Sequence, residues 1–436
     1  MNIDTVAVYS TADKDSLHVK LATKAVCIGP AKASQSYLNM NSILTAALDN
    51  HCDAIHPGFG FLSENSDFAR LCEENNIKFI GPKADVIDAM GNKAMAKTMM
   101  RKGNVPVVPG SDGALKDYDE AKEIADRIGY PVLLKASAGG GGRGMRRAYS
   151  EEELKKAYDE AKAEARACFG NDEMYIEKLI VNPRHIEFQI LADEMGNVVH
   201  LGERDCSIQR KNQKLIEESP CMLLSDELRD KMGVAAVNAA KASGYTNAGT
   251  VEFVLDGDNN FYFIEMNTRI QVEHGVTEMV TGIDLIKEQI RIAFHEPLGF
   301  EQEDIKLKGH AMECRINAED PAKGFMPNSG KITFLNLPGG PGVRVDTMLY
   351  NGYETSPFYD SMMAKIIVHA PTRLEMIRKM RRALMEISTE GITTTSDFEY
   401  LILFHPDFIK GKYNVGFIEE HMDEILSWDA FGEGNE

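Results

Sequence analysis

The sequence predicts an α/β and α+β protein of about three domains. Its 436 residues would make roughly three domains of ~150 residues each. The N-terminal part alternates strand-like and helical segments, which is typical of a parallel sheet with helical crossovers. After residues 309–321 the pattern changes to short strands between Pro and Gly turns, which indicates a separate α+β domain. We therefore expect domains over residues 1–84, 85–306 and 307–436.

The first domain begins almost at once with a strand. Hydrophobic spacing predicts a small parallel sheet from strands over 5–9, 54–56 and 77–80, with helices over 35–49 and 64–75 between them. Residues 81–110 then form a helical stretch that ends in a Pro/Gly loop, which places a boundary near residue 84.

The middle domain contains a smaller unit over about 108–180. That unit should hold helices over 118–128 and 151–168, a glycine loop between them and a strand over 174–178. Beyond it we expect a hairpin over 186–204, a helix over 225–243 and a second hairpin over 250–266. The third domain should contain a helix over 372–388.

Composition excludes several function classes. The net charge is −19, and broad nucleic-acid binding needs clustered Lys and Arg. The seven cysteines are scattered and form no CxxC, which favours reduced thiols. No apolar run approaches the ~20 residues of a membrane helix, and the start lacks the regions of a signal peptide. We expect a soluble cytoplasmic protein that binds neither nucleic acid nor membrane.

The glycine-rich segment PVLLKASAGGGGRGM (131–145) indicates a phosphate-binding flap. Walker A is excluded because Lys135 precedes the glycines instead of following them. A Rossmann loop opens directly into a helix, whereas here residues 145–148 intervene and the next helix has its own capping box at Ser150 and Glu153. We expect a strand, a glycine hairpin and a second strand, with backbone N–H groups free to approach phosphate. A flexible surface turn is the alternative.

Polar residues alternate in the segment EMNTRIQVE (265–273), where Glu265, Asn267, Arg269, Gln271 and Glu273 follow i, i+2 spacing. If the segment is extended, all five side chains point to one side. With GDNN (257–260) as the hairpin loop, paired residue numbers sum to 517, so Glu252 faces Glu265. Like charges directly opposite are unfavourable, and a cation would reverse the sign. Oxygen ligands from Glu252, Glu265 and Asn267 suit Mg²⁺; a solvated strand face is the alternative.

Cations gather in GERDCSIQRKNQKLIEESP (202–220), which carries Arg204, Arg210, Lys211 and Lys214. Either this is a solvated loop or it is an anion cradle. Arg315 lies in an apolar strand-like segment and, since buried cations need partners, either pairs structurally or meets a ligand. Together with the flap and the carboxylate pair, these residues describe a nucleotide enzyme.

Several strings make the chain resemble biotin carboxylase, the ATP-grasp subunit of bacterial acetyl-CoA carboxylase. They are HPGFGFLSEN (56–65), PGSDG (109–113), KASAGGGGRGM (135–145), EKLIVNPRHIEFQ (177–189), GERDCSIQR (202–210), FIEMNTRIQVEH (263–274), ECRINAEDP (313–321) and YDSMMAKI (359–366). The resemblance covers nearly the whole chain. It implies an ATP-grasp fold with an N-terminal pre-ATP-grasp domain, a mobile glycine-loop lid and a C-terminal biotin carboxylase domain.

The resemblance also implies a reaction. ATP, bicarbonate and biotin would give ADP, phosphate and carboxybiotin through carboxyphosphate, as the first half-reaction of acetyl-CoA carboxylase in malonyl-CoA and fatty acid synthesis. Mg²⁺ or Mn²⁺, as two ions, would be the cofactor. Biotin would arrive on a biotin carboxyl carrier protein, and carboxyltransferase subunits would be further partners. Relatives form homodimers.

By position, the resemblance assigns roles to individual residues. ATP contacts would come from Lys93, Lys135, Gly141, Gly142, Glu177, Lys178, Leu179, Ile180, His185, Gln209, Asn212, Glu252 and Glu265. The metal shell would be Glu252, Glu265 and Asn267, and the bicarbonate site would be Lys214, Arg269, Gln271 and the backbone of Val272. Glu273 resembles the general base, and Arg315 resembles the residue that holds biotin and stabilises its enolate. Lys214, Arg269, Glu273 and Arg315 form the catalytic set.

The chain departs from the family pattern at three places. Asn212 stands where the family has histidine, so that contact with phosphate loses its charge. Phe59 stands where tyrosine is common, which removes a hydroxyl near the biotin site. Nothing like the family's opening IANRGEIA precedes Thr5, so we expect a shortened first domain that is less stable and dimerises less well than full-length relatives.

Two other functions fit the same motifs. One is an ATP-grasp ligase that joins a carboxylate to an amine through an acyl phosphate, and the other is a binding subunit without turnover. Because the chain has no Met-Lys-Met motif, we expect a free-standing subunit that does not carry biotin itself.

Overall fold

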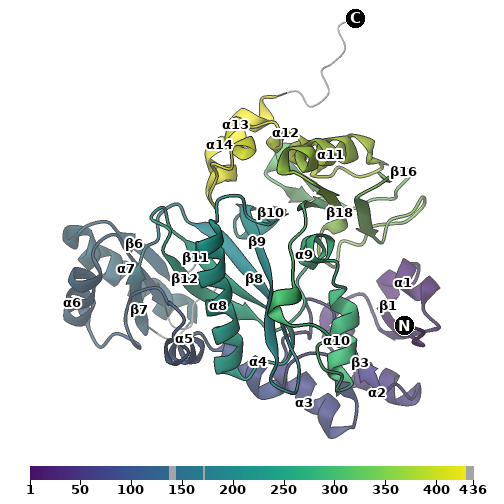
Figure 1. Cartoon of the computed structure of the whole chain (residues 1–436), viewed down its shortest axis with the longest axis horizontal. Coiled ribbons are helices and arrows are strands. Elements are labelled where there is room, and N and C mark those ends of the chain that lie inside the picture. Colours follow the sequence, from purple (N-terminus) through teal and green to yellow (C-terminus); the bar gives the residue numbers. More distant parts are fainter. Residues whose placement is uncertain (137–143, 170–171, 429–436) are drawn as a thin grey trace, which may run out of the picture.

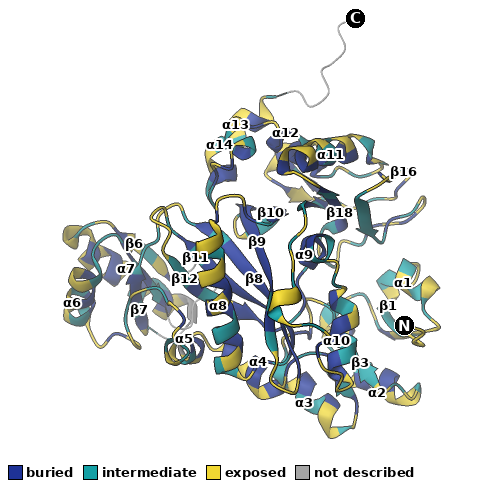
Figure 2. Cartoon of the chain, viewed as in Figure 1, coloured by how far each residue is buried: buried dark blue, intermediate teal, exposed yellow. Residues whose placement is uncertain are grey.

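The computed structural model describes residues 1–136, 144–169 and 172–428 (Figure 1). Its centre is an eight-stranded sheet in the order β12-β11-β8-β9-β10-β13-β18-β17, in which all neighbours are antiparallel. The strands of this sheet are buried on both faces near its middle (Figure 2). Within the described residues, no helix is both long enough and apolar enough to cross a membrane.

The sheet strands have the following bounds. They are β8 (Arg184–Ala192), β9 (Val198–Arg210), β10 (Gln213–Ser219), β11 (Asn247–Leu255), β12 (Phe261–Asn267), β13 (His310–Asn317), β17 (Val343–Thr347) and β18 (Met362–Ala370). Both predicted hairpins are confirmed, as β8–β9 and β11–β12. The sheet crosses the boundary predicted at residue 306, because β10 pairs with β13. The division into three domains stays a prediction.

Helix α8 (Asp226–Ser243) covers one face of this sheet and confirms the helix predicted over 225–243 (Figure 1). It begins at Ser225, whose hydroxyl accepts from the N–H of Leu228, and it ends at Gly244 in the left-handed region (φ +62°). Its buried face is rich in small residues. Among them, Ala236, Ala239 and Ala240 pack into the core with strands β8 and β11. Small side chains let the helix approach the sheet closely.

The N-terminal part differs from the prediction. Strand β1 (Val6–Ser10) pairs in parallel with β2 (Lys24–Gly29), and β3 (Ala54–Ile55) pairs in parallel with β4 (Lys78–Phe79), so two separate ribbons replace the single predicted sheet. Strand β2 was missed because its short apolar run has no clear period. The helices of this part are α1 (Leu17–Leu21), α2 (Met40–Asp49), α3 (Ser66–Glu74), α4 (Ala84–Gly91) and α5 (Lys93–Lys102).

The predicted small unit stands apart at the left of Figure 1. Strands β5 (Val132–Ala136), β6 (Met145–Ala148) and β7 (Met174–Lys178) form a sheet in the order β6-β5-β7, with α6 (Tyr118–Ile128) and α7 (Glu151–Phe169) packed on it. Leu134, Leu154 and Ile176 belong to a hydrophobic core of this unit alone. The two strands predicted on either side of the glycine segment are confirmed as the antiparallel pair β5–β6. The predicted phosphate contacts Gly141 and Gly142 lie outside the described residues.

The remaining helices pack at several places along the sheet, and short strands belong to the C-terminal part. The helices are α9 (His274–Thr281), α10 (Leu285–Ala293), α11 (Arg373–Glu386), α12 (Ser396–Ile402), α13 (Pro406–Ile409) and α14 (Phe417–Leu426), and the short strands are β14 (Glu319–Asp320), β15 (Met326–Pro327), β16 (Phe334–Asn336) and β19 (Ser388–Glu390). Helix α11 confirms the helix predicted over 372–388 and packs on β13 and β18.

The basic segment over 202–220 is not the solvated loop considered from the sequence. It forms the hairpin β9–β10, whose two-residue turn is Lys211 (φ +48°) and Asn212 (φ +65°). Positive φ at both positions is the type I′ geometry that matches strand twist. Asparagine tolerates this region better than most residues.

The turn makes a prediction for stability. Asn212→Val should lower the free energy of unfolding by about 1–2 kcal/mol, because a β-branched residue is strained at positive φ. Asn212→His should stay within about 0.5 kcal/mol of the parent, because histidine also tolerates the left-handed region. Urea unfolding of both variants checks this, and equal stabilities of the Val and His variants would contradict the turn assignment.

Candidate active site

The two carboxylates predicted to face each other do so. Glu252 on β11 pairs with Glu265 on β12, as the register predicted. A bulge between Glu252 and Phe253 shifts the outer pairs, so that Leu255 faces Phe261. The loop therefore starts at residue 256, one residue earlier than expected, and the bulge restores the predicted register at the site.

This pair suits a cation. Burial raises the pKa of Glu265, and the facing carboxylate of Glu252 raises it further. Glu265 forms no hydrogen bond or ion pair with the residues that the structure describes. Glu252 stays charged: burial raises its pKa, but Lys214 and His185 hold it well below its ordinary value. Asn267 completes an oxygen-rich group by donating Nδ2 to Oε1 of Glu252 at 2.7 Å. Carboxylate and amide oxygens in this arrangement fit Mg²⁺ or Mn²⁺.

The alternating row is extended only as far as Asn267, where β12 ends. The expectation that all five side chains point to one side of a strand is therefore wrong, because residues 268–273 turn into helix α9. The turn still keeps its polar groups near the carboxylates. Arg269 donates to Oδ1 of Asn267 (3.0 Å) and to Glu64 (3.0 Å), and Gln271 donates to Glu252 (2.8 Å).

Lys214 is the centre of the charged group. Its Nζ lies 2.6 Å from Oε2 of Glu187, 2.6 Å from Oε1 of Glu273 and 3.4 Å from Oε1 of Glu252. Burial raises the pKa of Glu273, but the ammonium of Lys214 outweighs burial and the pKa falls to about 2. Of the four cations in the basic segment, Arg210 instead stacks on Phe325 and bonds Gly324.

Arg315 forms a buried ion pair with Glu217 and also contacts Glu273 of the charged group around Lys214. Its Nε donates to Glu217 (2.6 Å) and its Nη2 donates to Oε2 of Glu273 (2.7 Å). Glu273 is therefore held between Lys214 and Arg315, one cation at each oxygen. Glu217 is fully buried, and burial raises its pKa to about 7 despite the guanidinium.

The predicted nucleotide residues divide between the small unit and the central sheet. Lys135 on β5 lies 2.6 Å from Glu177 on β7, and Lys97 on α5, which sequence reasoning missed, contacts the other oxygen of Glu177. Burial first, and then neighbouring lysines, lower the pKa values of Lys97 and Lys135 to about 8. Lys178 points back into its own unit, where Nζ donates to the carbonyls of Gly129 (3.0 Å) and Tyr130 (2.9 Å).

The remaining predicted residues are spread along the sheet. His185 on β8 has Nε2 3.1 Å from Glu252, which outweighs burial and raises the pKa of the histidine to about 9. Gln209 is buried on β9, and Asn212 is exposed in the turn that follows. Leu179 donates its N–H to Pro131 (3.0 Å), and Ile180 follows it after the end of β7. Lys93 lines a hollow of about 200 Å³ with Glu265 and Asn267.

Sequence reasoning missed partners that hold the site together. Glu187 follows His185 at i+2 on β8, so strand periodicity could have found it. Lys365 on β18 donates to the carbonyl of Val272 (2.5 Å) and so fixes the peptide that precedes Glu273. Lys97 lies one helical turn after Lys93, a spacing that places both lysines on one face of α5. No pattern of this kind points to Lys365.

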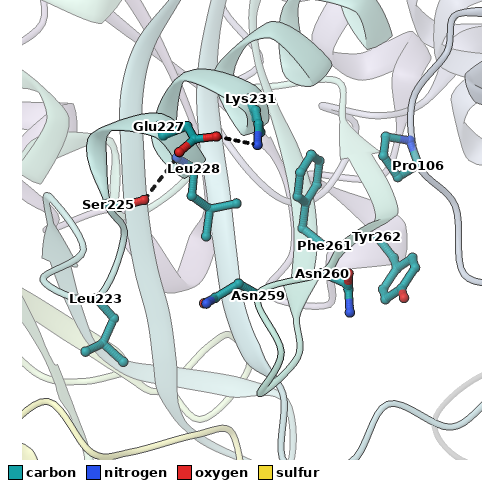
Figure 3. Close-up of a pocket in the computed structure, with 10 residues that line it drawn as sticks. All are labelled: Pro106, Leu223, Ser225, Glu227, Leu228, Lys231, Asn259, Asn260, Phe261 and Tyr262. Atoms are coloured by element: carbon teal, nitrogen blue, oxygen red, sulfur yellow. Dashed lines mark hydrogen bonds and ion pairs between the residues drawn. The ribbon is translucent and has the colours of Figure 1, made fainter.

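A separate hollow of about 530 Å³ lies where the start of α8 meets the tip of the β11–β12 hairpin (Figure 3). Leu228, Lys231, Asn259 and Phe261 are among its lining residues. None of the predicted site residues lines it.

Three family models match the chain. They are the biotin carboxylase N-terminal domain (residues 1–87), the carbamoyl-phosphate synthase L chain ATP-binding domain (92–300) and the biotin carboxylase C-terminal domain (313–420). Together with the antiparallel sheet, the first two of these models define the class of the protein as an ATP-grasp ligase.

Individual relatives agree with this class. Biotin carboxylase of Arabidopsis thaliana chloroplasts is 56% identical over 98% of this chain and 79% of its own length, and biotin carboxylase 1 of Bacillus subtilis (strain 168) is 55% identical over 97% and 94%. The biotin carboxylase domain dimer of Hydrogenobacter thermophilus 2-oxoglutarate carboxylase, solved with MgADP, ADP and bicarbonate, superposes with a TM-score of 0.89 at 52% identity, covering 98% of this chain and 94% of that one. The chain belongs to the biotin carboxylase family, and its activity is the ATP-dependent carboxylation of biotin.

Proposed function

We propose that this chain is the biotin carboxylase subunit of a cytoplasmic acetyl-CoA carboxylase. Biotin would arrive on a biotin carboxyl carrier protein, and carboxyltransferase subunits would pass the carboxyl group to acetyl-CoA. Identity above 50% to bacterial and chloroplast biotin carboxylases supports this complex. The 2-oxoglutarate carboxylase relative shows that similar domains also serve a different acceptor. A homodimer, as in that relative's structure, completes the proposal.

In this proposal, ATP lies between the small unit and the central sheet. Lys93 and Lys135 would meet the phosphates, with Glu177, Lys178, Leu179, Ile180, His185 and Gln209 around the rest of the nucleotide. Burial lowers the pKa of Lys135. A bound anion stabilises the charged ammonium and raises this pKa again, so the lysine still favours phosphate binding. Glu252, Glu265 and Asn267 would hold two Mg²⁺ or Mn²⁺ ions, which supply charge neutralisation for the transferring phosphoryl group.

The bicarbonate site would lie beside Glu273. Lys214, Arg269, Gln271 and the N–H of Val272 supply donors for the anion, and Glu273 takes the bicarbonate proton while a bicarbonate oxygen attacks the γ-phosphorus and ADP leaves. The observation that carries this assignment is the pair of contacts that holds Glu273 between Lys214 and Arg315. An anion that competes for Lys214 raises the pKa of Glu273 and so makes it a stronger base.

The second half of the reaction would use Arg315. Carboxyphosphate breaks down to CO₂ and phosphate, and the phosphate takes the N1 proton of biotin. The enolate that forms needs a fixed cation, and a guanidinium stays charged at every working pH. The deprotonated N1 of biotin then attacks CO₂ and forms the new carbon–nitrogen bond. No atom is oxidised or reduced in this step.

ADP formation tests the proposal directly. The complete mixture contains ATP, Mg²⁺, bicarbonate and free biotin, and each of the last three is omitted in turn. We expect ADP release to fall by at least about tenfold in every omission, because the groups act together. ADP release that continues without bicarbonate would overturn the proposal. A chain that binds ATP but never turns over would be the binding subunit considered above.

The carboxylate pair gives a prediction for the metal. Glu265→Gln should raise the Mg²⁺ concentration needed for half-maximal ADP formation by about tenfold, since one hard oxygen ligand loses its charge. Without Mg²⁺ the same variant should unfold at an equal or higher temperature, because the repulsion between Glu252 and Glu265 is gone. Glu227→Gln, at an exposed pair with Lys231, is the control for both measurements. A lower melting temperature without Mg²⁺ would contradict the repulsive pair.

A further inference from the structure

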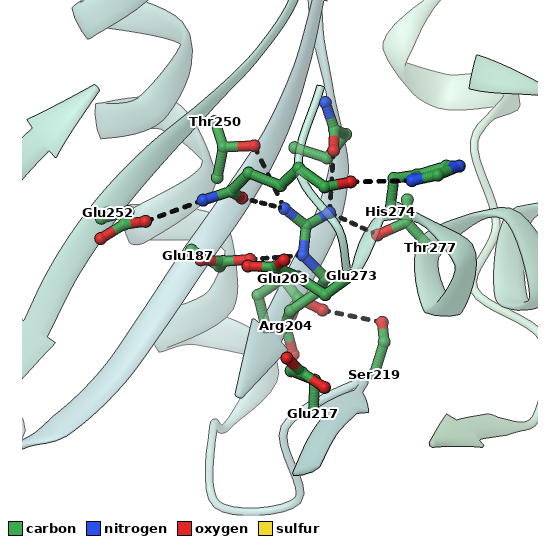
Figure 4. Close-up of polar contacts among 12 residues, drawn as sticks. Glu187, Glu203, Arg204, Glu217, Ser219, Thr250, Glu252, Glu273, His274 and Thr277 are labelled. Carbon is green, nitrogen blue, oxygen red and sulfur yellow. Dashed lines mark hydrogen bonds and ion pairs between the residues drawn. The ribbon is translucent and has the colours of Figure 1, made fainter. Parts of the chain in front are cut away.

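Arg204 is the fully buried guanidinium at the centre of Figure 4. Its Nε donates to Glu187 (2.5 Å), Nη1 donates to Gln189 (2.8 Å) and Thr277 (3.0 Å), and Nη2 donates to Thr250 (3.1 Å) and Gln271 (2.7 Å). An arginine side chain has five N–H donors, so each of them has an acceptor. Arg204 therefore has no donor left for a substrate anion, although the sequence grouped it with the possible cradle.

The five acceptors come from four separate parts of the chain. Glu187 and Gln189 lie on β8, Thr250 lies on β11, Gln271 lies in the turn after β12, and Thr277 lies on α9. Arg204 thus ties the turn that carries the proposed bicarbonate residues to the sheet beneath it. A planar fork with fixed donor directions fixes the relative positions of these parts.

Gln271 shows the consequence for the substrate. A guanidinium can only donate, so the side-chain oxygen of Gln271 must face Arg204 and the amide nitrogen must face the other way. That nitrogen donates one hydrogen to Glu252 at 2.8 Å. In the proposed function, its second hydrogen would be the donor to bicarbonate. Without Arg204 the amide can rotate and present its oxygen, which repels an anion.

Glu187 carries the second connection. One of its oxygens accepts from Arg204, and the other lies 2.6 Å from Nζ of Lys214. Burial raises the pKa of Glu187, but Lys214 and Arg204 hold it well below its ordinary value. The carboxylate is thus fixed in one orientation and places the ammonium of Lys214 against Glu273.

We propose that Arg204 is a positioning residue for bicarbonate: it sets the amide of Gln271 and, through Glu187, the ammonium of Lys214. This inference rests on the proposed function, in which Gln271 and Lys214 bind the anion. Lysine at this position would keep the charge but could not reach both Gln271 and Glu187 from one nitrogen.

The test compares Arg204→Lys with Arg373→Lys. Arg373 is a matched control because it is also buried and bonds Glu218 through two nitrogens, away from the proposed site. We expect Arg204→Lys to raise the KM for bicarbonate at least about tenfold and to lower kcat/KM for bicarbonate about 100-fold, with the KM for ATP changed less than about threefold. Arg373→Lys should lose comparable thermal stability and keep its KM for bicarbonate.

Two further variants decide between explanations. Thr277→Val removes one acceptor of Arg204 without touching substrate, and it should raise the KM for bicarbonate by about twofold to fivefold even if Arg204→Lys does not fold. An unchanged KM in Thr277→Val, or equal effects of the two arginine variants, would overturn the positioning role. Gln271→Leu separates the two proposals: an unchanged KM for bicarbonate there would overturn the anion assignment and this inference together. A raised KM in Gln271→Leu beside an unchanged KM in Arg204→Lys would overturn this inference alone.

Discussion

Glu273→Gln should lower bicarbonate-dependent turnover by about 10³-fold, because glutamine keeps the shape of the side chain but cannot take a proton. ATP binding should change by less than about threefold, since the nucleotide residues lie on other elements. The variant leaves Lys214 and Arg315 with Glu187 and Glu217 as partners, so both cations stay paired. Steady-state ADP formation and equilibrium titration with a nucleotide analogue measure the two quantities.

Glu278→Gln provides the control for this variant. Glu278 lies on helix α9, is largely buried, and pairs with Arg344 outside the proposed site. It should lose stability without losing turnover. If Glu273→Gln retained more than about a tenth of the parent turnover, general-base catalysis by this carboxylate would be excluded.

Arg315→Met should uncouple ATP cleavage from biotin carboxylation. We expect carboxybiotin formation to fall by about 10²- to 10³-fold, because the enolate loses its fixed cation. Bicarbonate-dependent ADP formation should fall much less, since Arg315 no longer lowers the pKa of Glu273, which becomes a stronger base. Glu217, whose pKa of about 7 allows it to take up a proton, limits the cost of losing its partner.

The ratio of carboxybiotin to ADP measures this uncoupling. The parent should give nearly equal amounts, and Arg315→Met should give far more ADP than carboxybiotin. An equal ratio in the variant would remove Arg315 from the enolate step. Arg315→Lys separates charge from geometry, because lysine keeps the charge and loses the fork that reaches both Glu217 and Glu273.

Sequence patterns predicted those parts of the fold that local physics determines. The hairpin β11–β12 has apolar residues alternating with polar ones and a polar loop, so its register and the facing of Glu252 and Glu265 were predictable. The position of the bulge between Glu252 and Phe253 was not predictable, because it depends on the strands that pair on both sides of β11. The polar alternation over residues 265–273 predicted an extended strand, which is wrong beyond Asn267. There the chain turns towards helix α9, and this turn overrides the extended pattern.

The charged centre of the site was only partly predictable. The pairing of Glu273 with Lys214 and Arg315 joins a helix start to two strands that lie far apart in the sequence. Such contacts depend on the tertiary arrangement and leave no local periodicity. The same holds for Arg204, which looked like one of several loop cations and proved to be fully buried. The split of the N-terminal strands into two ribbons likewise depends on pairing that no single segment encodes.

The central claim is that bicarbonate, not water, attacks ATP at the site around Glu273. Bicarbonate labelled with ¹⁸O tests it, with the released phosphate analysed by mass spectrometry in the complete reaction. Attack by a bicarbonate oxygen leaves that oxygen on phosphorus when carboxyphosphate loses CO₂, so we predict one labelled oxygen in each phosphate formed. Unlabelled phosphate released together with ADP would show that water attacks instead, and would contradict the mechanism.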